Sequence, residues 1–380
     1  MEMKQLHVLT IVGTRPEIIR LSRVICHLNT SNSIKHTLVH TGQNYDYNLN
    51  EVFFDELGIT KPDFFLNSAG KSASETIGKI LINIESILDE LKPDAILILG
   101  DTNSCLSAIV AKKKKIPIFH MEAGNRCYDQ NVPEETNRKI VDHISDINMP
   151  YSSIGRDYLI KEGIKPETII KTGSPMNEVI NFYSDKITNS KIIEKLGLKE
   201  ENFFVVSAHR EENVDNFERL EELILTLNSI SKEYKFPIIF STHPRTQKQL
   251  KNISLKPSDN IRFIEPLGFI DYVALQKKSI IVLSDSGTIS EESSLLNFRA
   301  INIRSSNERP EAMEEASVMM IDINRERILQ GIKILLFQNK SKRDYNKVYD
   351  YDVSNVSKKV ERIIMSYTDY VNKNVWQKKS

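Results

Sequence analysis

Two segments of the chain pair small, hydroxyl and charged residues in a way that suits anion binding. The segment GTRPE (13–17) follows an apolar run, and SDSGT (284–288) follows another, with a helix expected after each. Helix N-termini attract anions through unpaired N–H groups and the helix dipole. Arg15 and Arg20 add guanidinium donors to the first segment. We therefore expect a phosphate or diphosphate site at 13–17 and a second anion site at 284–288. The alternatives are a plain strand–helix turn with its arginines in solvent for the first segment and an ordinary capped helix for the second.

Three carboxylates stand where acid–base chemistry could use them. Asp101 lies in GDT, Glu122 interrupts the apolar stretch FHMEAG, and Glu134 begins a helix four residues before Arg138. Asp101 could equally be a helix cap, and Glu134 with Arg138 could be a surface ion pair. Glu122 is harder to explain structurally, because a carboxylate at the inner end of an apolar strand costs free energy.

Further polar residues follow the later apolar runs. His209 and His243 each stand beside an arginine, which favours phosphate contact over the alternative of a structural histidine. Ser286 and Gly287 are expected to serve as helix cap and close-approach residue. Glu292 could accept from ribose hydroxyls or simply be exposed. The segment SSNERPEA (305–312) brings Arg309 after another strand, as an anion contact or a plain loop.

The elements that must position these residues alternate between strand and helix patterns, which predicts an α/β fold of parallel βαβ units. Open α/β sheets bind ligands beyond the carboxyl ends of their strands, so two such sheets facing each other would enclose a cleft. Strands are predicted at 6–12, 36–41, 94–99, 116–121, 203–207, 237–242, 261–264, 279–284 and 300–303. Helices are predicted at 16–28, 48–57, 74–91, 102–114 and 354–371.

The pattern restarts after residue 172, which predicts two doubly wound domains. We expect residues 1–172 to form a Rossmann-like domain with the carboxylates and residues 173–352 to form a second one. Residues 353–380 would form a C-terminal helix that packs back on the first domain.

Composition excludes several classes of protein. The 51 basic and 51 acidic residues balance, which gives no footprint for nucleic acid or an anionic membrane surface. Cys26, Cys105 and Cys127 have neither disulfide-like nor zinc-like spacing, which fits a reducing compartment. No stretch suits a membrane span or a cleavable leader, so a cytoplasmic protein is expected. The first strand is not followed by a Gly-x-Gly-x-x-Gly motif, which argues against a dinucleotide-dependent dehydrogenase. No Walker-type loop appears either.

The ordered set GTRPE, GDT, EAG, PEE with NR, HR.EN, DSG with EE, and ERPEA resembles the UDP-N-acetylglucosamine 2-epimerase family over nearly the whole chain. That resemblance implies two Rossmann-like domains of the glycosyltransferase B type with the active site between them, no metal or cofactor, and a homodimer. A family lysine matches Arg20, which keeps the charge but changes its geometry.

Within the family, the segments at 41–59 and 122–143 resemble the branch that converts UDP-2-acetamido-2,6-dideoxy-L-talose to UDP-N-acetyl-L-fucosamine for capsule or O-antigen lipopolysaccharide. The UDP-N-acetylglucosamine/UDP-N-acetylmannosamine branch, the alternative, typically has Gly-Leu-Arg-Thr at 124–127 and a Gln-His-Arg pattern at 43–45. The second difference puts in doubt the allosteric UDP-sugar site of some bacterial relatives.

The resemblance also assigns roles to residues. Asp101, Glu122, Glu134 and His209 match catalytic positions. UDP-binding positions are matched by Arg15, Arg20, Arg138, His209, Leu267, Tyr272, Ser286, Gly287, Thr288, Glu292 and Arg309.

The family reaction eliminates UDP across C1 and C2 and adds it back with protonation of C2 from the opposite face. Acid and base with separated pKa values suit this task. A glycosyltransferase, a hydrolysing 2-epimerase and a non-catalytic UDP-sugar sensor are the rival readings.

Overall fold

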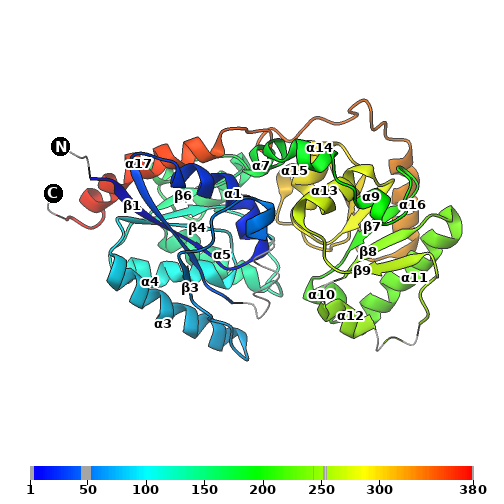
Figure 1. The fold of residues 1–380 in the computed structure, drawn as a ribbon, viewed down its shortest axis with the longest axis horizontal. Helices are drawn as coiled ribbons and strands as arrows, with labels where there is room; N and C mark the ends of the chain where they lie inside the picture. Colours follow the sequence, from blue (N-terminus) through cyan, green and yellow to red (C-terminus); the bar gives the residue numbers. More distant parts are fainter. Residues whose placement is uncertain (1–3, 44–52, 243, 251–252, 254, 379–380) are drawn as a thin grey trace. The chain divides into compact units, whose positions relative to one another are not determined.

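The computed structural model describes residues 4–43, 53–242, 244–250, 253 and 255–378. They form two compact units. Unit 1 comprises residues 1–181 and 350–380, and unit 2 comprises residues 182–349. Each unit is built on one parallel six-stranded sheet with helices on both faces (Figure 1). The expected fold class, α/β with two Rossmann-like doubly wound domains of the glycosyltransferase B type, is confirmed by these sheets.

The sheet of unit 1 has the strand order β3-β2-β1-β4-β5-β6. Its strands are β1 (Leu6–Val12), β2 (Ile34–His40), β3 (Phe64–Phe65), β4 (Ala95–Leu99), β5 (Ile118–Met121) and β6 (Ile147–Met149). The helical segments are α1 (Arg15–Asn29), α3 (Ala73–Leu91), η1 (Asn103–Leu106), α4 (Ser107–Lys113), α5 (Pro133–Ile144), α6 (Ser153–Lys161), η2 (Pro166–Thr168), α7 (Met176–Phe182) and α17 (Val356–Asn374). The central strands are buried throughout, as their continuous apolar sequence predicts.

Two helical layers cover the sheet of unit 1. Helices α3, α4 and α5 pack on one face through a core that includes Ile84, Ala108 and Val141. Helices α1 and α17 pack together in unit 1, and the His27 ring of α1 lies 2.7 Å from the Glu361 carboxylate of α17. Figure 1 shows this pair and the α3–α4 pair on opposite sides of the sheet. The C-terminal helix thus completes the unit that the N-terminus begins.

The sheet of unit 2 has the order β12-β11-β10-β7-β8-β9. Its strands are β7 (Phe204–Ser207), β8 (Ile238–Ser241), β9 (Ile261–Ile264), β10 (Ile281–Ser284), β11 (Ala300–Asn302) and β12 (Met319–Met320). Its helices are α8 (Ser184–Thr188), α9 (Ile192–Lys195), α10 (Glu211–Val214), α11 (Phe217–Tyr234), α12 (Pro244–Leu250), α13 (Phe269–Lys278), α14 (Ile289–Leu296), α15 (Pro310–Glu314) and α16 (Arg325–Leu336). Leu223 and Leu227 of α11 pack with Ile328 and Ile332 of α16 in the main core.

Every predicted strand is present, with ends within two residues of the expectation. The three additional strands β3, β6 and β12 are two or three residues long. The helix expected at 102–114 is a 3₁₀ turn followed by α4. Part of the helix expected at 48–57 lies outside the described residues, and residues 53–56 are helical.

Candidate active site

In each sheet, the strand order reverses between two strands that are followed by turns with polar and charged residues. In unit 1 the order reverses between β1 and β4, which are followed by the turns 13–17 and 100–104. In unit 2 it reverses between β7 and β10, which are followed by the turns 207–211 and 284–288. Crevices at such points are where doubly wound sheets bind ligands.

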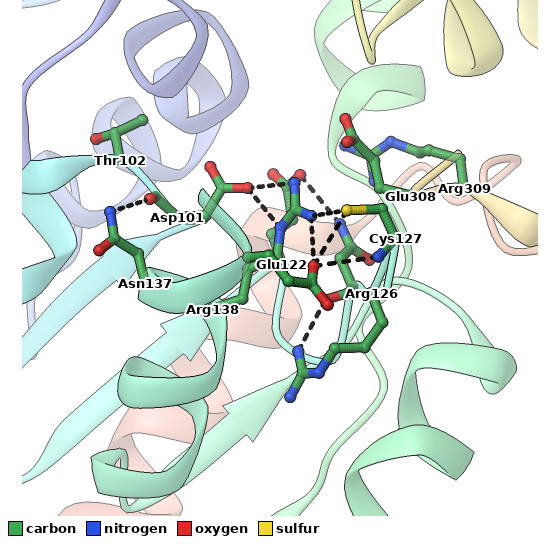
Figure 2. Close-up of polar contacts among 12 residues, drawn as sticks. Asp101, Thr102, Glu122, Arg126, Cys127, Asn137, Arg138, Glu308 and Arg309 are labelled. Carbon is green, nitrogen blue, oxygen red and sulfur yellow. Dashed lines mark hydrogen bonds and ion pairs between the residues drawn. The ribbon is translucent and has the colours of Figure 1, made fainter. Parts of the chain in front are cut away.

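Asp101, in the turn after β4, is bound by the guanidinium group of Arg138 from α5. Nε and one terminal nitrogen of Arg138 each lie 2.7 Å from the same Asp101 oxygen, Oδ2 (Figure 2). Asn137 donates to the Asp101 carbonyl at 2.8 Å. The Asp101 side chain is one-fifth exposed, whereas Arg138 is buried. This carboxylate is therefore held in place and still accessible.

Arg138 is a buried residue and not a surface one. Besides Asp101, it pairs with the Glu135 carboxylate, at 3.1 Å and one turn back in α5. Glu134 is half-buried in the first turn of the same helix. Pro133 begins this helix, so the acidic residues of its first turn face the positive end of the helix dipole.

Glu122 follows β5 in a left-handed backbone conformation, with φ of 65°. This conformation costs a residue with a side chain about 1–3 kcal/mol and persists only where surrounding contacts impose it. Its backbone N–H donates to the Met149 carbonyl, and Asn125 donates to its Oε1 at 3.2 Å. Oε2 lies 3.7 Å from the Arg20 guanidinium. The carboxylate therefore sits between an amide and a cation.

Arg20 and Arg15 occupy different environments on α1. Arg20 is buried, beside Glu122 and 5.7 Å from the Tyr151 ring centre. Arg15, the first residue of α1, is half-buried with its guanidinium carbon 4.2 Å from the centre of the Phe53 ring. Neither is a simple solvent-exposed arginine.

The turn that opens α1 carries a buried carboxyl group for which the sequence suggested no role. Glu17 accepts from the Gly13 N–H at 3.0 Å and from the Thr14 hydroxyl at 2.7 Å, and the Ser104 hydroxyl donates to its other oxygen. Burial raises the pKa of Glu17 to about 7, against these hydrogen bonds, which lower it. The Gly13 N–H group is thus already hydrogen-bonded to a side chain of the protein itself.

His209, after β7, has its ring orientation set by a buried carboxylate. Nδ1 lies 3.1 Å from Oδ1 of Asp285, which also accepts from the backbone N–H groups of His209 and Arg210 and from Asn213. The ring itself is about half exposed. An Asp–His pair of this kind presents Nε2 outward in one defined direction.

The turn after β10 differs from the expectation in one detail. Thr288, not Ser286, is the N-cap residue of α14, and the two hydroxyls lie 3.0 Å apart. Gly287 is a close-approach residue, since a Cβ there would lie 2.7 Å from Oε1 of Glu308. Glu292 is buried and accepts from Gln276 at 2.9 Å, so it is not a solvent-exposed helical residue.

The remaining expected contacts of unit 2 lie near the same sheet. Arg309, the N-cap residue of α15, is buried with its guanidinium 3.6 Å from Glu291 of α14. Leu267 precedes α13 and Tyr272 lies in its first turn, and both are half-buried. His243 and the end of the Gln43-Asn44-Tyr45 pattern lie outside the described residues.

Several functional candidates were not found from sequence. They are Glu17, Asn125, His120 with Asp142, Asp285, and Glu308, which pairs with Arg210 and Arg304 at 3.0 Å each. His120 and Asp285 carry one usable signal, a polar residue inside or directly after an apolar run, whereas Glu308 lies in the polar segment SSNERPEA and carries none. In the described part of the chain, no group of three or more His, Cys, Asp or Glu side chains is arranged to hold a metal ion. Likewise, none of the described helices has the length and apolar character of a membrane span.

Comparison with known proteins decides the family. Residues 27–365 match the family described as UDP-N-acetylglucosamine 2-epimerase. The chain belongs to this family. It is accordingly an isomerase, a UDP-sugar 2-epimerase.

The similarity extends over whole chains. The solved structure of UDP-N-acetylglucosamine 2-epimerase from Rickettsia bellii is 50% identical, with a TM-score of 0.93 over 99% of this chain and 100% of that one. A Methanococcus maripaludis UDP-N-acetylglucosamine 2-epimerase is 39% identical over 88% of this chain and 92% of its own. The Methanocaldococcus jannaschii enzyme, solved with UDP-GlcNAc and UDP, is 33% identical with a TM-score of 0.88, covering 95% of this chain and 100% of that one.

Proposed function

We propose that the chain interconverts UDP-2-acetamido-2,6-dideoxy-L-talose and UDP-N-acetyl-L-fucosamine by inverting C2. The observation that carries the chemistry is the placement of Asp101 and Glu122 after the neighbouring strands β4 and β5, each against a buried arginine. The L-sugar assignment rests on the resemblance of segments 41–59 and 122–143. UDP-N-acetylglucosamine is the second candidate substrate, favoured by the Rickettsia and Methanococcus relatives that carry its name.

The reaction has to avoid an unstabilised carbanion, because C2 of a UDP-sugar is not adjacent to a carbonyl. We propose that a carboxylate removes the C2 proton while the C1–O bond breaks. The C–H electron pair forms the C1=C2 bond, and the C–O pair leaves with UDP. UDP then attacks C1 of the 2-acetamidoglycal, and a carboxylic acid protonates C2 from the other face. Asp101, Glu122 and Glu134 are the proposed acids and bases.

The leaving group gains negative charge as the C–O bond breaks, so fixed cations stabilise the transition state. In unit 1, we propose Arg15, Arg20 and Arg138 for this task. In unit 2, we propose His209, Arg309 and the turn Ser286-Gly287-Thr288, with Glu292 on the ribose and Leu267 and Tyr272 near the uracil. The outward-facing Nε2 of His209 supports its placement in this set.

Incubation of the purified protein in D₂O with each sugar, followed at C2 by NMR, tests the proposal. Deuterium at C2 with inversion in the L-talose derivative alone would support the first substrate, and exchange in UDP-N-acetylglucosamine alone would replace it by the second. Accumulation of free UDP would indicate the hydrolysing reaction. Binding without exchange in either sugar would contradict epimerisation and favour a glycosyltransferase or a sensor.

The Asp101→Asn variant tests the site. Loss of a general acid or base should lower the rate of C2 exchange about 10²- to 10⁴-fold. The control is Asp89→Asn, because Asp89 is an exposed residue of α3 that pairs with Lys114. Turnover near that of the unmodified protein in Asp101→Asn would remove Asp101 from the mechanism.

A further inference from the structure

A buried histidine of β5 reaches across to the turn that follows the neighbouring strand β4. His120 is in β5, two residues before Glu122, and its side chain is 1% exposed. Its Nε2 lies 2.9 Å from the carbonyl oxygen of Gly100, the residue that precedes Asp101. Its Nδ1 lies 3.0 Å from Oδ1 of Asp142 in α5. One ring therefore spans from the turn after β4 to the helix that carries Arg138.

Asp142 is a fixed anchor for this ring. It is fully buried and accepts from the Gly124 N–H at 3.1 Å and from a terminal nitrogen of Arg126 at 2.7 Å. Arg126 in turn donates to both oxygens of Glu162, at 2.8 and 2.6 Å. Burial favours the neutral acid, but His120 and Arg126 outweigh it and lower the pKa of Asp142. The anchor is therefore an ionised carboxylate.

The surroundings of the histidine favour its charged form. Burial by itself would lower the pKa of His120, but the ion pair with Asp142 and the Gly100 carbonyl outweigh burial and raise it. A carbonyl oxygen can only accept, and an ionised carboxylate can only accept, so both ring nitrogens face acceptors. The imidazolium form carries a proton on both nitrogens, which gives a hydrogen bond to the Gly100 carbonyl and an ion pair with Asp142.

One of the two turns joined by this ring has a backbone that needs external support. Glu122 has φ of 65°, which is strained for a residue with a side chain, whereas glycine adopts the φ of 75° at Gly100 freely. The Gly100 N–H donates to the Met121 carbonyl at 3.0 Å, which ties the turns from one side. His120 ties them from the other side, through the Gly100 carbonyl. Asp142 adds the Gly124 amide, so both sides of Glu122 are restrained.

We propose that His120 is a positioning residue, whose ring, anchored on Asp142, fixes the Gly100–Asp101 turn against the Glu122 turn and so sets the relative placement of the two carboxylates. This inference rests on the proposed function, since it presumes that Asp101 and Glu122 act at C2. Displacing a catalytic group by about 1 Å can lower a rate about 10²-fold. His120 itself contacts neither oxygen of these carboxylates in the contacts described.

A pair of substitutions separates the two halves of the contact. His120→Gln places an amide N–H near the position of Nε2 and keeps a donor for Gly100, whereas His120→Asn places one near Nδ1 and keeps a donor for Asp142. Positioning through Gly100 predicts that His120→Asn lowers kcat about 10²-fold and that His120→Gln stays within about tenfold of the unmodified protein. UDP affinity, measured by calorimetry, should change less than about twofold in both, because unit 2 carries most of the proposed UDP contacts.

The control for a purely structural role is the unfolding temperature measured beside kcat. Both variants remove an imidazolium from Asp142, so both should lose stability. If kcat, counted per UDP-binding molecule, fell equally in the two variants or stayed unchanged in His120→Asn, the positioning role would be overturned. Should His120→Asn fail to fold, Asp142→Asn tests the positioning role through the anchor of the ring. It weakens the anchor without changing shape, and unchanged kcat there would overturn the proposal.

The failure of this inference can be told apart from failure of the proposed function. If Asp101→Asn abolishes C2 exchange but the histidine variants behave alike, only the positioning role is wrong. If Asp101→Asn exchanges deuterium at the normal rate, the proposed site is wrong irrespective of His120.

Discussion

The Arg138 guanidinium contacts the Asp101 carboxylate through two nitrogens that converge on a single oxygen, Oδ2, each at 2.7 Å. Arg138 is buried, and it also pairs with the Glu135 carboxylate, 3.1 Å away. Two charged donors on one oxygen restrain the position of that oxygen. We conclude that α5 holds Oδ2 of Asp101 in place at the end of β4.

The Arg138→Lys substitution tests that conclusion. A lysine keeps the positive charge but cannot place two donors on one oxygen while also reaching Glu135. We expect kcat for C2 exchange to fall about 10-fold to 100-fold. NMR of C2 in D₂O measures the effect, with Lys139→Arg as a control on the same helix. An unchanged kcat would show that charge alone suffices.

The Asn125 amide is expected to tune Glu122, since it donates to Oε1 at 3.2 Å. Asn125→Leu removes this donor at similar size, and a hydrogen bond to a charged group is worth about 1.5–3 kcal/mol. We expect kcat to fall about tenfold or more. The Asn125→Asp substitution places a second negative charge beside Glu122, so kcat should fall further in this variant. Measured rates in any other order would contradict the proposed importance of this contact.

Glu17 predicts a pH dependence of stability. Its pKa is about 7 in the folded protein against an ordinary value of 4.5, so the folded state binds the proton more tightly than the unfolded state. The contribution of protonated Glu17 to the free energy of unfolding is fully present below about pH 4.5 and is lost as the pH rises from there to about 7. Across this window the loss is on the order of 3 kcal/mol.

The Glu17→Gln variant checks this sign. Glutamine does not ionise, so the variant should not undergo this loss. Between pH 5 and pH 7.5, the free energy of unfolding of the variant should therefore rise relative to that of the unmodified protein. Denaturant titration measures this difference. Glu218→Gln, at an exposed position of α11, controls for the loss of a carboxyl group. Parallel pH curves for Glu17→Gln and the unmodified protein would refute the raised pKa.

Gly287 offers a test of unit 2. An added methyl group would lie 2.7 Å from Oε1 of Glu308, which pairs with Arg210 and Arg304. Gly287→Ala should therefore displace this cluster and weaken UDP binding about tenfold, measured by calorimetry. Gly78→Ala is the matched control, because a methyl group there meets nothing within 4 Å. Equal UDP affinity in the two variants would argue against the turn at 286–288 as a UDP contact.

The sheets could be predicted because their strands are continuous apolar runs that end in polar turns. The strand at 261–264 has the predicted bounds, whereas Phe64–Phe65 and Met319–Met320 are too short to show a period. The candidate site was predictable where a charged residue follows a strand, as at Asp101 and Glu122. The contacts of Glu17 with Ser104 and of His120 with Asp142 join residues distant in sequence, so no local pattern carries them.

The discontinuity of unit 1 has a consequence for the order in which the chain acquires its structure during synthesis. Residues 350–380, including α17, belong to unit 1, but they leave the ribosome after all of unit 2. At about 5–20 residues per second, the intervening residues 182–349 take roughly ten to thirty seconds to make. Over that interval the α1 face awaiting α17 lacks its cover, and unit 2 is the first complete folding unit of the nascent chain.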